Sequence, residues 1–154
     1  MKKISQVLVL MIGAIFLYNC GGTGEQKQTG EKATPAAQAD PNDPRNNKGI
    51  GPIKLMVLND INPALAAEGE AIYKEKCLAC HKPTEKFIGP APKGILDRRS
   101  PEWIMNMILN PEEMVKSDPI AKQLLIEANL APMANQHLTE AQARKVLEYF
   151  RTIK

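Results

Sequence analysis

Cys77-Leu78-Ala79-Cys80-His81 is the most informative stretch of this 154-residue sequence. Two thiols stand two residues apart, and a histidine directly follows the second one. This spacing suits covalent attachment of one haem, because both thiols can add to its vinyl groups while the adjacent histidine lies under the iron. We therefore predict one covalently bound haem c, attached through Cys77 and Cys80, with His81 as an iron ligand.

Two other chemistries also use closely spaced cysteines. A zinc half-site would need two further ligands, and only His137 is an obvious candidate. A thioredoxin-like dithiol would need a strand–helix–strand context, whereas residues 62–76 have the pattern of a helix. Haem is the favoured interpretation, and zinc binding and dithiol chemistry are the alternatives.

The third cysteine, Cys20, ends a pattern typical of a secretory signal. Lys2 and Lys3 form a positive start, and the apolar run over 7–17 is too short to span a bilayer comfortably. Residues 17–21, Leu-Tyr-Asn-Cys-Gly, resemble a lipobox, in which the cysteine is acylated. We predict a lipoprotein signal peptide at 1–19 and a lipid anchor at Cys20, which would hold the protein in the cell envelope on the periplasmic side. An uncleaved N-terminal membrane anchor is the alternative.

The sequence after Cys20 divides into a polar tether and a domain. Residues 21–48 contain no aromatic or branched aliphatic side chain, so they cannot bury enough apolar surface to offset their chain entropy. We predict a disordered tether over 20–48, with a typical span of roughly 30 Å, and a single domain over 49–154. Within that domain, alternating apolar residues and Pro52 predict an extended segment over 49–60 that packs across it.

Charge and composition exclude some functions and support the cofactor. The formal net charge is +3, and removal of Lys2 and Lys3 leaves 18 basic against 17 acidic residues, or +1. This balance argues against a nucleic-acid partner, which normally requires clustered positive charge. Aromatic residues make up only 5% of the chain. So few would leave a small domain with a thin core, and a buried porphyrin would fill it.

Capping residues mark helix starts through the rest of the domain. A capping side chain followed directly by proline predicts three of them, at Asn62-Pro63, Ser100-Pro101 and Asp118-Pro119. The first of these helices ends near Lys76 and the third near Asn129. A fourth start combines Thr139 with Gln142 in a capping box. It precedes an apolar stripe formed by Ala143, Val146, Leu147, Phe150 and Ile153.

Together with the cysteine–histidine motif, these helices resemble the class I cytochrome c family over residues 62–154. Gly69 and Tyr73 lie on one face of the helix before the motif. In the family this face packs against the last helix, where Leu147 and Phe150 match the aliphatic and aromatic positions. The resemblance implies an all-α fold of about four to five helices wrapped around one covalently bound haem.

The same resemblance implies a second iron ligand and a partner for the first. A methionine ligand is expected shortly before the last helix, where Met133 stands. His137 is the competing ligand, with a surface position as its other interpretation. The carbonyl of Pro90 is the expected acceptor for the second ring nitrogen of His81, although an ordinary turn at 89–90 is the alternative. Three further methionines are interpreted as core residues: Met105, Met107 and Met114.

Trp103 and two arginines are candidates for contact with the haem propionates. A buried indole N–H needs a hydrogen-bond partner. In the family, a haem propionate is the partner of a residue in this region. Arg98 and Arg99 could pair with the same carboxylates. The alternative places Trp103 in the core and both arginines in solvent.

With both axial positions of the iron filled, we predict an electron carrier without enzymatic activity or a small-molecule substrate. It would be a monomer that serves redox protein partners in respiration. Similar small lipoprotein cytochromes are associated with bacterial respiratory reductases, including nitrous oxide reductase. One alternative is a haem-bearing subunit or dedicated electron donor of such a reductase. Another is a gas- or peroxide-responsive haem protein with an open sixth site on the iron. Lysines around the motif could steer acidic partners, or simply be solvated: Lys74, Lys76, Lys82, Lys86 and Lys93.

Overall fold

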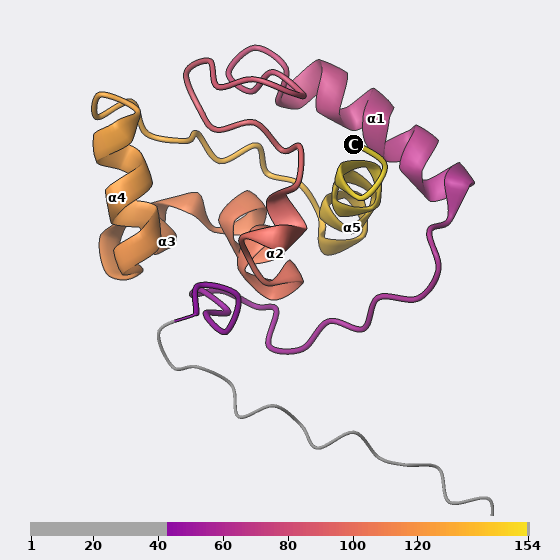
Figure 1. Ribbon diagram of the computed structural model, residues 1–154, viewed down its shortest axis with the longest axis horizontal. Helices are drawn as coiled ribbons and strands as arrows, with labels where there is room; N and C mark the ends of the chain where they lie inside the picture. Colours follow the sequence, from indigo (N-terminus) through magenta and orange to yellow (C-terminus); the bar gives the residue numbers. More distant parts are fainter. Residues whose placement is uncertain (1–42, 154) are drawn as a thin grey trace, which may run out of the picture. The chain divides into compact units, whose positions relative to one another are not determined.

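A computed structural model gives the fold and describes residues 43–153 (Figure 1). This part of the chain is helical and contains no β-strand, which confirms the predicted all-α class. It comprises α1 (Pro63–Lys76), a short 3-10 helix η1 (Ile95–Asp97), α2 (Pro101–Leu109), α3 (Pro111–Ser117), α4 (Pro119–Glu127) and α5 (Glu140–Phe150). Among residues 43–153, no helix has the length and apolar character that crossing a bilayer requires. The predicted signal peptide (1–19), Cys20 and most of the predicted tether lie outside the described residues.

The four predicted helix starts are confirmed by their caps. The side chains of Asn62, Ser100 and Asp118 accept hydrogen bonds from backbone N–H groups of the first turns of α1, α2 and α4. Thr139 and Gln142 form the reciprocal capping box at the start of α5. Each cap satisfies donors that the helix itself leaves unpaired, so these residues set where the helices begin.

α3 is absent from the helices predicted above. Its N-cap residue, Asn110, makes no side-chain capping bond, and the helix spans only seven residues. A sequence signal was nevertheless present, because Pro111 opens the helix and Glu112 and Glu113 lie in its first turn. The short helix is stabilised mainly by packing, since Met114 is fully buried.

α1 and α5 cross closely (Figure 1). A Cβ added at Gly69 would lie 1.9 Å from the carbonyl oxygen of Lys145, so only glycine permits this approach. One turn further along α1, the Tyr73 ring packs edge-on against Phe150, with centroids 5.7 Å apart. The predicted helix crossing is therefore confirmed. It fixes the position of the C-terminal end of α1, where the cysteine–histidine motif begins.

The core is formed mainly by α2 and α5, with Ile53, Met114 of α3 and Ala121 of α4 packed beside them. Trp103, Ile104 and Met105 of α2 are at most 2% exposed. From α5, Val146 and Leu147 are completely buried. α2 packs against α5 and α3, and α3 packs in turn against α4. α2 therefore lies between the α1–α5 pair and the α3–α4 pair in this series of helix contacts.

Residues 43–60 contain no helix, and Ile53 is buried, which agrees with the predicted extended segment over 49–60. Asn106 of α2 holds this segment with three hydrogen bonds of 2.9 Å. Its amide oxygen accepts from the N–H of Ile53, and its amide nitrogen donates to the carbonyls of Ile53 and Lys48. By contrast, Leu55 and Val57 are 74% and 69% exposed, so only part of the apolar alternation faces the core.

The predicted end of the disordered tether at Lys48 is wrong. The Asn47 amide donates to the Asp118 carboxylate at 2.6 Å, and its carbonyl accepts from the Ser100 hydroxyl at 2.6 Å. Lys48 forms an ion pair with the buried Glu102 at 3.2 Å. The composition of these residues suggested disorder because they carry little apolar surface. Buried polar groups of α2 and Asp118 order them instead through hydrogen bonds.

Candidate cofactor site

A single cavity brings together all of the site residues predicted within the domain. Its walls come from the end of α1, residues 77–99, α2, the α3–α4 pair and the loop before α5. The remaining lining is mostly aliphatic and includes Ile95, Ile104, Leu124 and Leu125. The predicted site residues that line it are Cys77, Cys80, His81, Pro90, Arg98, Arg99, Trp103 and Met133.

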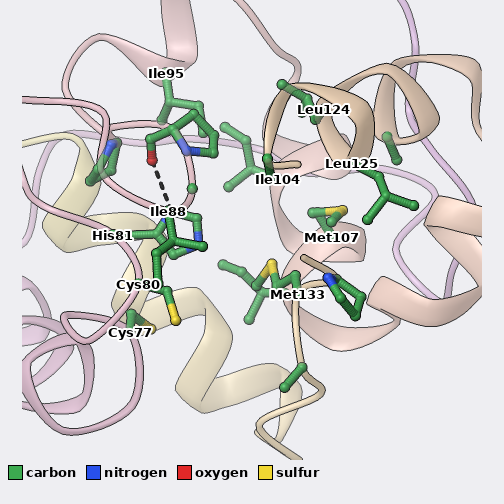
Figure 2. A pocket seen from close by; sticks show the side chains of 18 of the residues that line it. Cys77, Cys80, His81, Ile88, Ile95, Ile104, Met107, Leu124, Leu125 and Met133 are labelled. Atoms are coloured by element: carbon green, nitrogen blue, oxygen red, sulfur yellow. Dashed lines mark hydrogen bonds between the residues drawn. The ribbon is translucent and has the colours of Figure 1, made fainter. Parts of the chain in front are cut away.

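The two predicted iron ligands face each other across this cavity. Figure 2 shows Cys77, Cys80 and His81 on one side and Met133 on the opposite side. Met107 and Leu125 lie on the same side as Met133. The space between the two groups is therefore bounded by an imidazole on one wall and a thioether on the other.

The motif begins where α1 ends. Cys77 is the C-cap of α1, and its N–H donates to the carbonyl of Tyr73 at 2.9 Å. The chain then turns, because the N–H groups of Cys80 and His81 both donate to the carbonyl of Cys77, at 3.1 and 2.9 Å. This compact turn presents both sulfur atoms and the imidazole to the same cavity.

Two neighbours hold the imidazole of His81. Its Nδ1 lies 2.8 Å from the carbonyl oxygen of Pro90, as the family resemblance implies. Since a carbonyl can only accept, Nδ1 carries the proton and the lone pair of Nε2 is left for a metal. A Cβ at Gly89 would lie 2.2 Å from the ring atom Cε1, so glycine lets the backbone pack against the imidazole.

The protonation of Cys77 and the position of His137 help to distinguish haem attachment from dithiol chemistry and zinc binding. Burial, with a smaller contribution from neighbouring Cys80, raises the pKa of Cys77 to about 11. Disulfide exchange proceeds through a thiolate, so this environment disfavours a redox-active dithiol. His137 is exposed and does not line the cavity. Within residues 43–153, no group of three or more histidine, cysteine or acidic side chains is arranged to hold a metal ion.

The structure supplies protein partners for Trp103 and the two arginines. The Trp103 indole N–H donates to the Asp118 carboxylate at 3.1 Å, which agrees with the alternative that Trp103 is a core residue. Arg98 donates to the carbonyls of Ala91, Lys93 and Gly94, at 3.0, 2.9 and 2.9 Å. The Arg99 guanidinium lies 5.4 Å from the centroid of the Trp103 ring. Trp103 is thus a buried residue whose polar atom is already satisfied, although it and both arginines also line the cavity.

The roles of two residues at the site, Met107 and Tyr73, were not identified from the sequence. Met107 lines the cavity and was interpreted above as a core residue. Its helical spacing held the signal, since Trp103, Ile104, Met107 and Ile108 form the face of α2 toward the cavity. The hydroxyl of Tyr73 donates to the carbonyl of His81, and no sequence pattern indicated this bond. Burial raises the pKa of Tyr73 to about 12, and neighbouring Tyr149 and Cys77 add to the increase.

These residues fit a covalently bound haem. Two thiols stand at the edge of a mostly aliphatic cavity, and a histidine with a free Nε2 faces into it. A thioether is positioned across from the histidine. An apolar porphyrin with an iron at its centre needs this set of groups, and the porphyrin would supply the interior that the few aromatic residues cannot.

Comparisons with known proteins agree with this geometry. The cytochrome c family profile matches residues 66–154. Cytochrome c-551 of Stutzerimonas stutzeri is 50% identical over 36 residues, which are 23% of this chain and 35% of that protein. The match therefore spans about a third of the length of that curated relative.

Solved structures extend the likeness to most of the described fold. Cytochrome c from Rhodothermus marinus is 43% identical, with a TM-score of 0.65, over 67% of this chain and 89% of that one. An engineered form of the same cytochrome, bound to a carbene intermediate, gives a TM-score of 0.61 at the same identity and coverage. The chain belongs to the cytochrome c family. Its cofactor is haem c, and Cys77 and Cys80 fit the family's attachment motif.

Proposed function

We propose that the protein is a single-haem electron carrier in which His81 and Met133 ligate the iron and Cys77 and Cys80 hold the porphyrin. The observation that carries this proposal is the placement of His81 and Met133 on opposite sides of one mostly aliphatic cavity, with both thiols beside it. Haem, when bound there, supplies a one-electron iron couple. With two protein ligands on the iron, no position is open to a substrate, which favours electron transfer over catalysis.

The ligands set the direction of the reduction potential. Pro90 and Gly89 fix the His81 imidazole so that Nε2 faces the cavity. A thioether ligand favours ferrous iron, so Met133 would raise the potential relative to two nitrogen ligands. We expect a positive midpoint potential. His137 lies exposed, away from the cavity lining, and this position favours Met133 as the ligand.

Redox partners would dock on the surface beside the cavity opening. The side chains of Phe87 and Ile88 are 56% and 43% exposed. Ile88 also lines the cavity. Lys86 directly precedes these two residues, and its ammonium donates to the carbonyl of Glu127 at 3.0 Å, next to the exposed Ile126. Apolar side chains flanked by lysines suit brief contact with an acidic partner. Lys74 and Lys76 are paired with Glu70 and Glu75, at 2.8 Å in each case, so they contribute less to such steering.

We further propose that the protein is a lipoprotein monomer, acylated at Cys20 and facing the periplasm. The residues from Cys20 to Asn46 would link the anchor to Asn47, which is hydrogen-bonded to the domain. This tether keeps the carrier close to membrane-associated respiratory partners. A terminal reductase, with nitrous oxide reductase as one example, is a candidate partner by family analogy.

The central test uses the full chain matured in cells that attach haem in the periplasm. We expect a mass increase of one haem per chain, and a ferric absorption band from sulfur to iron at the red end of the spectrum. A Cys20→Ala variant should keep both properties but leave the membrane fraction. A colourless protein, or one without the haem mass, would overturn the proposed function. A haem protein without the sulfur band would overturn ligation by Met133.

A further inference from the structure

Tyr73 contacts the attachment motif through both its backbone and its side chain. Its carbonyl accepts hydrogen bonds from the N–H groups of Cys77 and Leu78, both at 2.9 Å. Its hydroxyl donates to the carbonyl of His81. One residue of α1 therefore holds residues 77–81 at both ends.

The Tyr73 side chain is itself firmly held. It is 1% exposed and packs against Phe150 and Tyr149, with ring centroids 5.7 and 5.2 Å away. Phenylalanine would fill the same space, so the packing of α1 against α5 does not require the hydroxyl. A buried hydroxyl is costly unless it is hydrogen-bonded, and here its partner belongs to the motif.

Within the described chain, the other hydrogen bonds of residues 77–81 do not involve the carbonyl of His81. Pro90 and Gly89 orient the imidazole of His81, and the carbonyl of Cys77 accepts from the backbone N–H groups of Cys80 and His81. The carbonyl of Cys80 accepts from the N–H of Gly89 at 3.0 Å. The Tyr73 hydroxyl is the group that holds the carbonyl of His81, where the chain leaves the turn. Without it, Cys77 would stay tied to the backbone of α1, while the segment of Cys80 and His81 would lose an anchor.

We propose that Tyr73 is a positioning residue for haem attachment, whose hydroxyl holds Cys80 and His81 in place so that the second thioether link forms. The inference rests on the proposed function, because it takes Cys80 as an attachment site and His81 as the iron ligand. Each link adds one S–H across one vinyl group. Sulfur bonds to one vinyl carbon and hydrogen to the other, so no atom leaves and no oxidant or reductant is consumed.

The test compares Tyr73→Phe with Tyr149→Phe in the full chain, matured in cells and purified. Tyr149 is a matched control, because it belongs to the same ring cluster and its hydroxyl has no hydrogen-bond partner among residues 43–153. The product is treated with an alkylating reagent, and peptide mass spectrometry then measures how much haem is joined by one thioether with a free Cys80 thiol. Thermal unfolding of each holoprotein is followed in parallel.

We expect the share of one-link product with free Cys80 to rise roughly fivefold in Tyr73→Phe, as loss of one hydrogen bond predicts. Tyr149→Phe should match the wild type. Equal shares in all three proteins would overturn the inference. A Tyr73→Phe protein with lower stability but an unchanged Cys80 share would also overturn it, because the hydroxyl would then serve the fold alone. If the wild-type chain takes up no haem, the proposed function itself fails.

Discussion

The two walls of the cavity are held in different ways. On the His81 side, the bond from the Tyr73 hydroxyl, the bond from His81 Nδ1 to the Pro90 carbonyl and the close approach of Gly89 fix the motif, next to the tight crossing of α1 and α5. On the Met133 side, within the described chain, every hydrogen bond found for residues 132–138 stays inside that loop. Those bonds run from Gln136 to the carbonyl of Ala134 and from the N–H of His137 to Asn135.

This contrast indicates which side of the site the folded chain forms before a cofactor binds. The His81 wall is specified by the folded chain and would be nearly complete before any cofactor binds. The Met133 loop includes or borders three residues in the left-handed region: Asn129, Leu130 and His137, with φ of 53°, 63° and 52°. No hydrogen bond ties residues 132–138 to another segment of the described chain, so we expect the bond from Met133 to iron to order this loop.

The largest effect should come from breaking the α1–α5 crossing behind the His81 wall. In Gly69→Ala the new Cβ would meet the Lys145 carbonyl at 1.9 Å, so the two helices must separate. We expect a loss of about 3 kcal/mol in the free energy of unfolding, or no folded protein. Denaturant unfolding of the holoprotein measures it. Ala67→Ser, at an exposed position of the same helix, is the control and should change little.

The next largest effect should come from removing the thioether on the weakly held wall. Met133→Ala should abolish the sulfur-to-iron band and lower the midpoint potential by on the order of 0.1 V or more. Added imidazole should then bind the open iron. Met107→Ala removes the other cavity-lining thioether and should keep the band. If only Met107→Ala lost the band, the assignment of the two methionines would be reversed.

A third test concerns a buried carboxylate on α5. Glu148 is fully buried and accepts hydrogen bonds from Arg144, from Arg151 at 2.9 and 3.1 Å and from the N–H of Asn62 at 2.8 Å. Glu148→Gln should cost about 2 kcal/mol in the free energy of unfolding, because both arginines lose their charged partner. Urea titration at neutral pH checks this value. Glu113→Gln, at a more exposed ion pair with Lys116, should have little effect.

The same carboxylate predicts a pH dependence. Burial alone would raise the pKa of Glu148, but hydrogen bonds from Arg144, Asn62 and Arg151 outweigh it and hold the pKa below its usual 4.5. The group therefore stabilises the fold above about pH 4.5, and this contribution is lost as the pH falls through the lower pKa of the folded state. The stability difference between wild type and Glu148→Gln should narrow in acid. A difference that widened in acid would contradict the assignment.

The smallest effect should come from a hydrogen bond between the loop after the motif and α4. Lys86, in the loop after the motif, donates to the carbonyl of Glu127 at the end of α4. Lys86→Met should cost at most about 1 kcal/mol in the free energy of unfolding, since the lysine is exposed to solvent. Lys122→Met, on the exposed face of α4, is the control. Electron transfer to an acidic partner should slow with rising salt in the wild type, and less so in Lys86→Met.

The parts of this protein that were predictable rest on local chemistry. The motif at 77–81 and the capping residues act within a few positions of the chain, so sequence patterns identify them directly. Gly69 and Tyr73 were also found, because helical spacing places them on one face. The resemblance to a known family added Met133 and Pro90, and the structure puts both at the cavity.

Apart from the missed helix α3 and the cavity position of Met107, the differences concern polar groups that pair between separate segments of the chain. The sequence left Trp103 open between contact with a propionate and a place in the core, and in the structure Asp118 accepts from its indole. The tether was expected to reach Lys48, but Ser100, Glu102 and Asp118 bind the last of those residues. A hydrogen bond leaves no periodic trace in the sequence, and either partner alone could equally face solvent.

The amino-acid sequence by itself determined the helical class, the positions of four helix starts and the chemistry of the attachment motif. Short-range geometry governs each of these features, since caps and covalent attachment depend on neighbouring residues. Only the tertiary structure decided which thioethers reach the cavity, that the Tyr73 hydroxyl holds His81, and that Asn47 is bonded to Asp118. Those outcomes depend on which distant surfaces meet, and they are selected by the packing of α1 against α5 and of α2 against its neighbours rather than by local propensity.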